Sequence, residues 1–340
     1  MELDKVLTGD RPTGKLHIGH YIGSLKTRTE MQSKYPTYIL VADVQALTDN
    51  YDNPEKIREN ILETTIDNLA VGVDPNKATF FIQSMIPQIA ELTIFFMNLV
   101  TKEQVLRNPT VKEEVMLKRG KFLGNPPFGF LAYPVSQAAD ILFLRANKVP
   151  VGDDQRPMIE LANDIAQKFN KIYQTDIFPT VEGVYSECGR LVGLDGAKKM
   201  SKSLGNTIFF DDSDEEITRK IMGMYTDPNR IRATDPGKVE GNPVFIYHDL
   251  FNPNKQEVED LKDRYRKGQV GDVEVKRKLI KAMIDFISPI RERRINISKD
   301  RNYVWDILQN GIKKVQIEAE ETMAKIKEAM KINYLNELVT

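Results

Sequence analysis

The stretch KVLTGDRPTG, residues 5–14, and the residues that follow it decide the fold. Residues 5–8 predict a strand, and residues 9–14 form a loop rich in turn-forming residues. A helix is expected to follow over residues 17–33. A strand, a glycine-containing loop and a helix in this order are typical of an open parallel sheet, which binds ligands beyond the carboxyl ends of its strands.

The same alternation continues along the chain. Residues 38–42 are a nearly continuous apolar run, as in a sheet covered on both faces, and residues 79–82 predict a third strand. Between them Pro54 opens a helix with an apolar stripe. We therefore expect an α/β fold, a Rossmann-like doubly wound parallel sheet. From about residue 212 the pattern is charged and helical, which predicts an all-helical C-terminal domain, and an apolar stripe over residues 307–323 predicts a long terminal helix.

Composition limits the class of protein. The chain has 340 residues, 41% of them hydrophobic and 29% charged, which is typical of a globular protein. Cys188 is the single cysteine, so no intrachain disulfide forms and a reducing compartment fits. The acidic N-terminus lacks a signal-peptide pattern, and the apolar run at residues 92–100 is too short to span a bilayer. The expected location is the cytoplasm, with no membrane partner.

A histidine pair follows the first loop. His17 and His20 are two of only three histidines, and they lie where the helix is expected to begin. Imidazoles there can donate to the phosphates of a nucleotide, and Gly19 lets an adenine ring approach bare backbone. The loop at residues 9–14 is by itself equally compatible with a plain tight turn.

A lysine-rich segment lies far downstream. Residues 198–203, KKMSKS, are followed by LGN. Lysine runs are most often solvated loops, but mobile lysines also suit a pyrophosphate leaving group, on which they can close as charge develops.

The two segments together resemble the HIGH and KMSKS signatures of class I aminoacyl-tRNA synthetases, in the right order and about 180 residues apart. The likeness extends to the tryptophanyl-tRNA synthetase family over nearly the whole chain. Further stretches carry it: residues 9–14 with 21–23, 133–142, 149–155 with 159–161, and 226–243.

Asp140 is the candidate that selects the amino acid. Indole offers one donor, its ring N–H, on an otherwise apolar surface, so its pocket needs one acceptor among apolar walls. Asp140 lies in a mostly apolar helical stretch, where it is either a buried acceptor or an acid on the exposed side. The resemblance implies that Asp140 accepts from the indole nitrogen.

The other site residues follow from the resemblance, position by position. The tryptophan pocket would contain Asp140, Gln137, Tyr133 and Gln155. The ATP site would contain Arg11, Pro12, Thr13, Gly19, His20, Gly152, Asp153, Asp154, Leu191, Lys199, Met200, Ser201, Lys202 and Ser203. The catalytic residues would be His17, His20, Lys112, Lys199 and Lys202. Lys112 is equally compatible with a solvated helix lysine beside two glutamates.

Three positions depart from the family's pattern. Many bacterial members have Gln in place of Arg11, Met in place of Gln137 and His in place of Gln45. These departures concern the walls around the indole and the ATP phosphates, and they leave Asp140 and both signatures intact.

The resemblance also implies the reaction and its partners. Tryptophan would be activated with ATP and Mg²⁺ and transferred to tRNA(Trp), with no metal-binding protein residues, in a homodimer. The expected catalytic domain is 1–210. Residues 211–340 would form a helical domain for the tRNA anticodon, with the terminal helix packing back on the catalytic domain.

Other functions fit some of these residues. A tyrosyl-tRNA synthetase could use Tyr133, Gln137 and Asp140 for a phenol, but residues 152–155 and 226–243 favour tryptophan. A tRNA-independent nucleotidylyltransferase shares a His-x-Gly-His loop, but is usually smaller and lacks the helical domain. A regulatory protein derived from a synthetase is disfavoured by the intact signatures. Because the net charge is −1, any RNA binding must come from a local basic face. The candidate is residues 281–301. Alternatively, the arginines of this segment form ion pairs that hold the C-terminal helices together.

Overall fold

The computed structural model describes residues 4–185, 191–196, 200, 202–227 and 230–334, with Ser203 described by its backbone alone. The chain divides into two compact units. The sheet unit comprises residues 1–15, 24–189 and 300–340, and the helical unit comprises residues 16–23 and 190–299. The expected functional boundary at residue 210 stays a prediction, because compactness rather than ligand binding defines these units.

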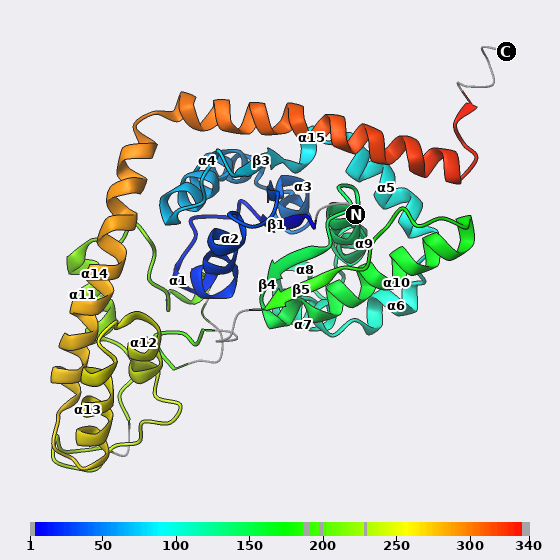
Figure 1. Ribbon diagram of the computed structural model, residues 1–340. Coiled ribbons are helices and arrows are strands. Elements are labelled where there is room, and N and C mark those ends of the chain that lie inside the picture. The colour runs from blue at the N-terminus through cyan, green and yellow to red at the C-terminus, as the bar shows by residue number, and fades with distance from the viewer. Residues whose placement is uncertain (1–3, 186–190, 197–199, 201, 228–229, 335–340) are drawn as a thin grey trace. The chain divides into compact units, whose positions relative to one another are not determined.

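A parallel five-stranded sheet forms the centre of the sheet unit, in the order β3-β2-β1-β4-β5 (Figure 1). The strands are β1 (Val6–Asp10), β2 (Thr37–Val41), β3 (Ala78–Ile82), β4 (Lys148–Val151) and β5 (Glu182–Tyr185). The first three lie where the sequence predicted them. β1 pairs with β2 on one side and with β4 on the other, so the order reverses beside β1, which is where such sheets bind ligands. The expected fold class is confirmed.

Parallel strands need crossover helices, and these fill the rest of the sheet unit. The clearest local cause is at α4, where Asn53 caps the N-terminus, Pro54 occupies the first turn and Gly72 ends the helix at a positive φ of 111°. The helices are α2 (Lys26–Met31), α3 (Asp43–Leu47), α4 (Pro54–Val71), α5 (Pro87–Met97), α6 (Lys102–Arg107), α7 (Pro109–Leu117), α8 (Arg119–Phe122), α9 (Phe128–Leu142), α10 (Arg156–Tyr173) and α15 (Arg301–Ala329), with 3₁₀ turns η2 (Gln83–Met85) and η3 (Asp153–Gln155).

The helix expected over residues 17–33 is present from Ile18 to Met31, with a π-helical turn inside it. It is divided into α1 (Ile18–His20), a π-helical turn η1 (Tyr21–Leu25) and α2. The boundary between the two compact units falls inside η1, between Gly23 and Ser24. The helix is therefore continuous apart from this π turn, and π turns of this kind are frequent at functional sites.

The terminal helix α15 packs along β3 within the sheet unit (Figure 1). Gly311 makes this close approach possible, because a Cβ atom there would lie 1.8 Å from the carbonyl oxygen of Phe80. Glu318 fixes the helix by accepting from Lys5 at 2.9 Å and from the Tyr38 hydroxyl at 2.7 Å. The predicted apolar stripe is thus buried against the sheet.

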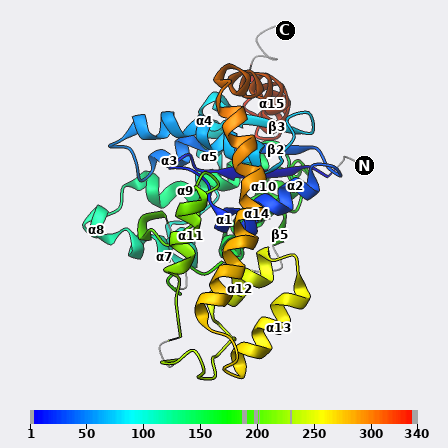
Figure 2. The same cartoon turned by 90° about the vertical axis from the view of Figure 1, so that its left-hand side faces the viewer.

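The helical unit is built around the long helix α14, against which α11 and α12 pack (Figure 2). Its elements are α1, η4 (Lys202–Leu204), α11 (Asp214–Met222), α12 (Pro243–Phe251), α13 (Lys255–Arg266) and α14 (Asp272–Ser298). Ser213 opens α11 with a capping box, at the start of the charged helical pattern expected from about residue 212. No helix in the described ranges is long and apolar enough to cross a membrane.

Candidate functional site

Asp140 is buried in α9, with 4% of its surface exposed. Its Oδ1 accepts a hydrogen bond from Gln83 at 2.6 Å, and its Oδ2 accepts one from Gln45 at 3.0 Å. Burial raises the pKa of Asp140 to about 7, although both amide donors act in the opposite direction. The alternative of an acid on the exposed side of the helix is wrong. Each carboxylate oxygen can accept more than one hydrogen bond, so Asp140 can still receive a donor from a ligand.

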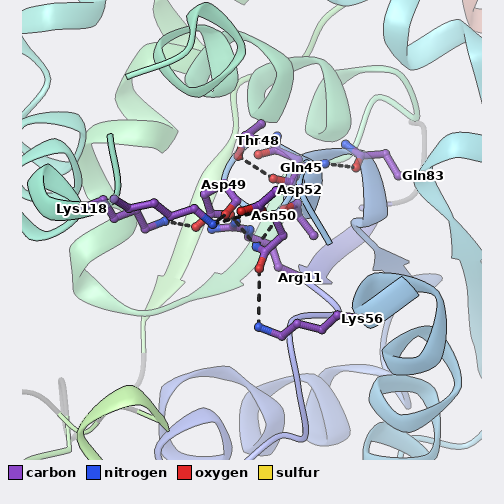
Figure 3. Close-up of polar contacts among 11 residues, drawn as sticks. Arg11, Gln45, Thr48, Asp49, Asn50, Asp52, Lys56, Gln83 and Lys118 are labelled. Atoms are coloured by element: carbon purple, nitrogen blue, oxygen red, sulfur yellow. Dashed lines mark hydrogen bonds and ion pairs between the residues drawn. The ribbon is translucent and has the colours of Figure 1, made fainter. Parts of the chain in front are cut away.

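The two glutamines reach Asp140 from the carboxyl ends of neighbouring strands. Gln45 lies in α3 just after β2, and Gln83 begins η2 just after β3. Oε1 of Gln83 also accepts from the backbone N–H of Gln45 at 2.9 Å, which closes a buried polar network (Figure 3). Sequence reasoning noted Gln45 only as a departure from the family and missed Gln83. The available signal was a polar residue directly after an apolar strand.

Tyr133 and Gln137 precede Asp140 by seven and three residues on the same helix, so they lie near the same face. Tyr133 is buried against Val111 and Met158, and burial, then the Glu114 carboxylate, raise the pKa of its hydroxyl. Gln137 donates to Oε1 of Gln155 at 3.1 Å. Tyr133, Gln137 and Gln155 therefore lie together along one side of α9.

Arg11, Pro12 and Thr13 follow β1 in the sheet unit, as predicted for the ATP loop. Arg11 forms an ion pair with Asp49, which also binds Lys118 (Figure 3). The Arg11 guanidinium lies near enough to Tyr133 to oppose the rise of that pKa. The loop after β1 thus lies next to the wall that contains Tyr133, within one unit.

The predicted ribose-side residues form the turn between β4 and α10. Asp153 pairs with Arg156 at 2.8 Å, and the carbonyl of Asp154 accepts from the Thr110 hydroxyl at 2.8 Å. Gly152 precedes this turn in extended backbone. Lys112, predicted to reach the phosphates, is exposed on α7. A different lysine of this region, Lys118, forms the ion pair with Asp49.

In the helical unit, His17 and His20 form a reciprocal cap at the start of α1. Nδ1 of His17 accepts from the Gly19 backbone N–H at 3.1 Å, and Nδ1 of His20 accepts from the His17 backbone N–H at 3.1 Å. Burial, then His20 and Lys202, lower the pKa of His17 far below its usual range. His17 is therefore neutral at pH 7, and its proton lies on Nε2, where it can be donated.

The downstream lysine segment adjoins these histidines within the same unit. Ile18 donates its backbone N–H to Ile208 at 3.1 Å, and a β-bridge pairs His17 with Phe209. A Cβ atom at Gly19 would lie 2.9 Å from the His17 ring and 3.0 Å from the sulfur of Met200, so any larger residue there would force these side chains to shift. The first signature thus lies beside the described residues of the second in the helical unit.

Of the other residues predicted for this site in the downstream part of the chain, some are described by the structure and some are not. Leu191 is buried, and the neighbouring Val192 carbonyl accepts from the Tyr247 hydroxyl at 2.8 Å. Lys199, Ser201, Cys188 and the side chain of Ser203 lie outside the described residues. Among the residues that the structure describes, no group of three or more His, Cys, Asp or Glu side chains is arranged to hold a metal ion.

The chain is similar in sequence and in structure to known proteins. Residues 3–288 match the family of tRNA synthetases class I (W and Y). The chain is 50% identical to the tryptophan–tRNA ligase of Lactococcus lactis over 97% of its own length and 98% of that protein. It is 49% identical to the tryptophan–tRNA ligase of Streptococcus pneumoniae, with the same coverage. It also resembles the structure of tryptophanyl-tRNA synthetase from Campylobacter jejuni complexed with ADP and tryptophan, with a TM-score of 0.81, 32% identity and coverage of 96% of this chain and 99% of that one.

Proposed function

Since the chain belongs to the class I tRNA synthetases for tryptophan and tyrosine, and is an ATP-dependent tryptophan–tRNA ligase, we propose that the residues described above carry out its two steps. In the first step, the carboxylate of L-tryptophan attacks the α-phosphorus of ATP, forming tryptophanyl-adenylate and releasing pyrophosphate. In the second step, a hydroxyl of the terminal adenosine of tRNA(Trp) attacks the acyl carbon and releases AMP.

The observation that carries this proposal is the buried acceptor at Asp140. Its carboxylate is held by Gln45 and Gln83 in the apolar interior, so its direction is fixed before a ligand binds. An indole N–H matches one such acceptor, because the rest of the ring offers only apolar surface. Gln137, Tyr133 and Gln155 form the adjoining wall and contact the amino acid.

The ATP-binding residues comprise three groups. Arg11, Pro12 and Thr13 bind the triphosphate from the loop after β1, and residues 152–154 bind the ribose from the turn after β4. Gly19, His20, Leu191 and the lysine segment contact the remainder of the nucleotide. Helix and strand ends of this kind present unpaired backbone N–H groups to anions.

Catalysis rests on positioning and on stabilising charge at the phosphates, with no covalent enzyme intermediate. His17, as a neutral imidazole, donates from Nε2, and His20 acts beside it. Lys199 and Lys202 bind the departing pyrophosphate, and Lys112 assists at the phosphates. Mg²⁺ enters with ATP, held by phosphate oxygens and water.

Three further features complete the proposal. The chain acts in the cytoplasm, where tRNA is charged, and the helical domain over residues 211–340 binds the anticodon arm.

A homodimer accounts for the exposed apolar side chains between residues 94 and 128, namely Ile94, Met97, Leu106, Met116, Leu117, Leu123 and Phe128. Sedimentation equilibrium should give twice the mass of one chain, and a single-chain mass at micromolar concentration would contradict the dimer.

The test of function is ATP–pyrophosphate exchange with each amino acid in turn, followed by acylation of tRNA(Trp). Exchange should depend on tryptophan and be negligible with tyrosine. If tyrosine drives exchange as well as tryptophan does, the pocket binds a phenol and the tryptophan assignment is wrong. Exchange that needs no amino acid would indicate a nucleotidylyltransferase.

A further inference from the structure

Asp49 lies beside the cationic side chains of Arg11 and Lys118 in the sheet unit (Figure 3). Its carboxylate binds Arg11 and Lys118, and its backbone carbonyl accepts from Lys121. Lys121 also lies 3.4 Å from Asp52. Among these five side chains, three positive charges face two negative charges, so one positive charge remains.

The cluster is fixed more firmly than a surface ion pair. The side chain of Asp49 is 12% exposed, and those of Arg11 and Lys118 are 33% and 26% exposed. Burial alone would raise the pKa of the Asp49 carboxyl, but Arg11 and Lys118 outweigh it and hold that pKa below its usual range. The Lys118 ammonium also lies 4.8 Å from the centre of the Phe130 ring. Both cations are therefore anchored to an ionised carboxylate at neutral pH.

The arginine retains unused binding capacity. Its Nη2 is the guanidinium nitrogen bound to Asp49, and 33% of the side chain is exposed, so other N–H groups of the guanidinium can face a ligand. A guanidinium presents five donors in a planar fork that matches phosphate oxygens. Asp49 is itself negative and cannot bind a phosphate, so its contribution to an anion site must pass through the cations that it holds.

Asp49 is also tied to the amino-acid pocket by its place in the chain. It follows Gln45 by four residues, in the turn that continues from α3. The Thr48 hydroxyl donates to the Gln45 carbonyl at 2.7 Å and fixes this turn (Figure 3). One short segment thus presents Gln45 to Asp140 and Asp49 to the nucleotide loop.

We propose that Asp49 is a positioning residue that holds Arg11 and Lys118 as a paired cationic site for the triphosphate of ATP. This rests on the proposed role of Arg11 in the ATP site. Long cationic side chains lose conformational freedom when they bind an anion, and a carboxylate that fixes them beforehand removes much of that loss. Asp49 therefore favours ATP binding although it carries the same sign of charge as the phosphates.

The test is pyrophosphate exchange with Asp49→Asn, measured against both substrates. The KM for ATP should rise about tenfold, because one oriented, charge-assisted contact is lost, while the KM for tryptophan changes by less than about twofold. Asp49→Glu should restore part of the ATP affinity. The matched control is Asp52→Asn, which removes the same charge from a side chain that is 59% exposed and should leave both KM values unchanged.

A double-mutant cycle separates positioning from structure. Arg11→Gln should also raise the KM for ATP, and adding Asp49→Asn to it should raise that KM by a smaller factor than Asp49→Asn does alone, because only the part of its effect that acts through Lys118 remains. An unchanged or lowered KM for ATP in Asp49→Asn overturns the proposal, as does a full additive effect in the cycle. A joint rise of both KM values with a lower melting temperature also overturns it.

The failure of this proposal differs from a failure of the assigned function. If Arg11→Gln leaves the KM for ATP unchanged while tryptophan-dependent exchange is normal, the cationic site is wrong and the function stands. If the unmodified protein shows no tryptophan-dependent exchange, the function itself fails.

Discussion

The side-chain amide of Gln83 donates to Oδ1 of Asp140 across 2.6 Å, and the two residues are 57 positions apart. Gln83 also accepts from the backbone of Gln45, which donates in turn to the other oxygen of Asp140. The buried carboxylate is thus fixed from both sides. A substitution at Asp140 consequently affects both ligand binding and two buried amides.

Replacing Asp140 by Ala should lower tryptophan activation at least tenfold. A hydrogen bond to a charged group is worth roughly 1.5–3 kcal/mol, and the two glutamines would be left with unsatisfied donors. The measurement is tryptophan-dependent pyrophosphate exchange, with circular dichroism to confirm folding. Asp140→Asn retains one acceptor and should lose less. A folded Asp140→Ala protein with normal activation would refute the role of this carboxylate.

The same residue predicts how stability depends on pH. The pKa of Asp140 is raised from 3.8 to about 7, so the folded protein holds this proton more tightly than the unfolded chain does. Its favourable contribution is full below pH 4 and is lost as pH rises through 7. Relative to Asp140→Asn, the unmodified protein should lose roughly 2–3 kcal/mol of unfolding free energy between about pH 5 and about pH 8.

Urea unfolding of both proteins at the two pH values measures this difference. A constant difference between the proteins would mean that Asp140 has the same pKa in the folded and unfolded states.

Replacing Lys202 by Ala should slow adenylate formation far more than it weakens tryptophan binding. The ammonium acts on charge that develops at the pyrophosphate, so its effect belongs to the transition state. Single-turnover kinetics gives the rate, and equilibrium titration gives the affinity for tryptophan. Lys267→Ala, at an exposed lysine of the same unit, serves as the control. Weaker tryptophan binding with an unchanged chemical rate would contradict this role.

Arg293 and Arg294 form a natural pair for testing the RNA face, because Arg293 is exposed and Arg294 is buried, with 7% of its surface accessible. Arg293→Ala should weaken tRNA binding and preserve adenylate formation. The slope of the logarithm of tRNA affinity against the logarithm of salt concentration should fall in magnitude by about one. Arg294→Ala should instead lower the melting temperature and both activities, because it removes a buried charge from its partners. A wild-type salt slope in Arg293→Ala would leave this segment with a structural role only.

Arg291 already shows that part of the segment is structural. Its guanidinium donates to the carbonyl of Asp212 at 2.6 Å and to the carboxylate of Asp214 at 2.7 Å, so it connects α14 to the start of α11. Lys281, Arg293 and Lys299 of the same segment are exposed, and the predicted RNA contacts are assigned to them.

The sequence by itself determined the features that depend on local pattern. Strand and helix periodicity predicted β1, β2, β3 and the long terminal helix, because side-chain alternation is a property of neighbouring residues. The two signatures and the apolar setting of Asp140 indicated the chemistry, because each is contained in a few consecutive positions. The π turn at Tyr21–Leu25, inside the helix expected over residues 17–33, was beyond such reasoning, because helical periodicity does not mark where an extra residue enters a turn.

Only the tertiary structure decided which side chains meet. Gln83 joins Asp140, and Asp49 joins Arg11 and Lys118, because parallel strands bring their carboxyl ends to one edge of the sheet. Gly311 lies against Phe80 although 231 positions separate them, and no local propensity requires glycine there. Such contacts form between segments far apart in the chain, so their partners depend on the packing of the whole unit and not on the pattern of either segment alone.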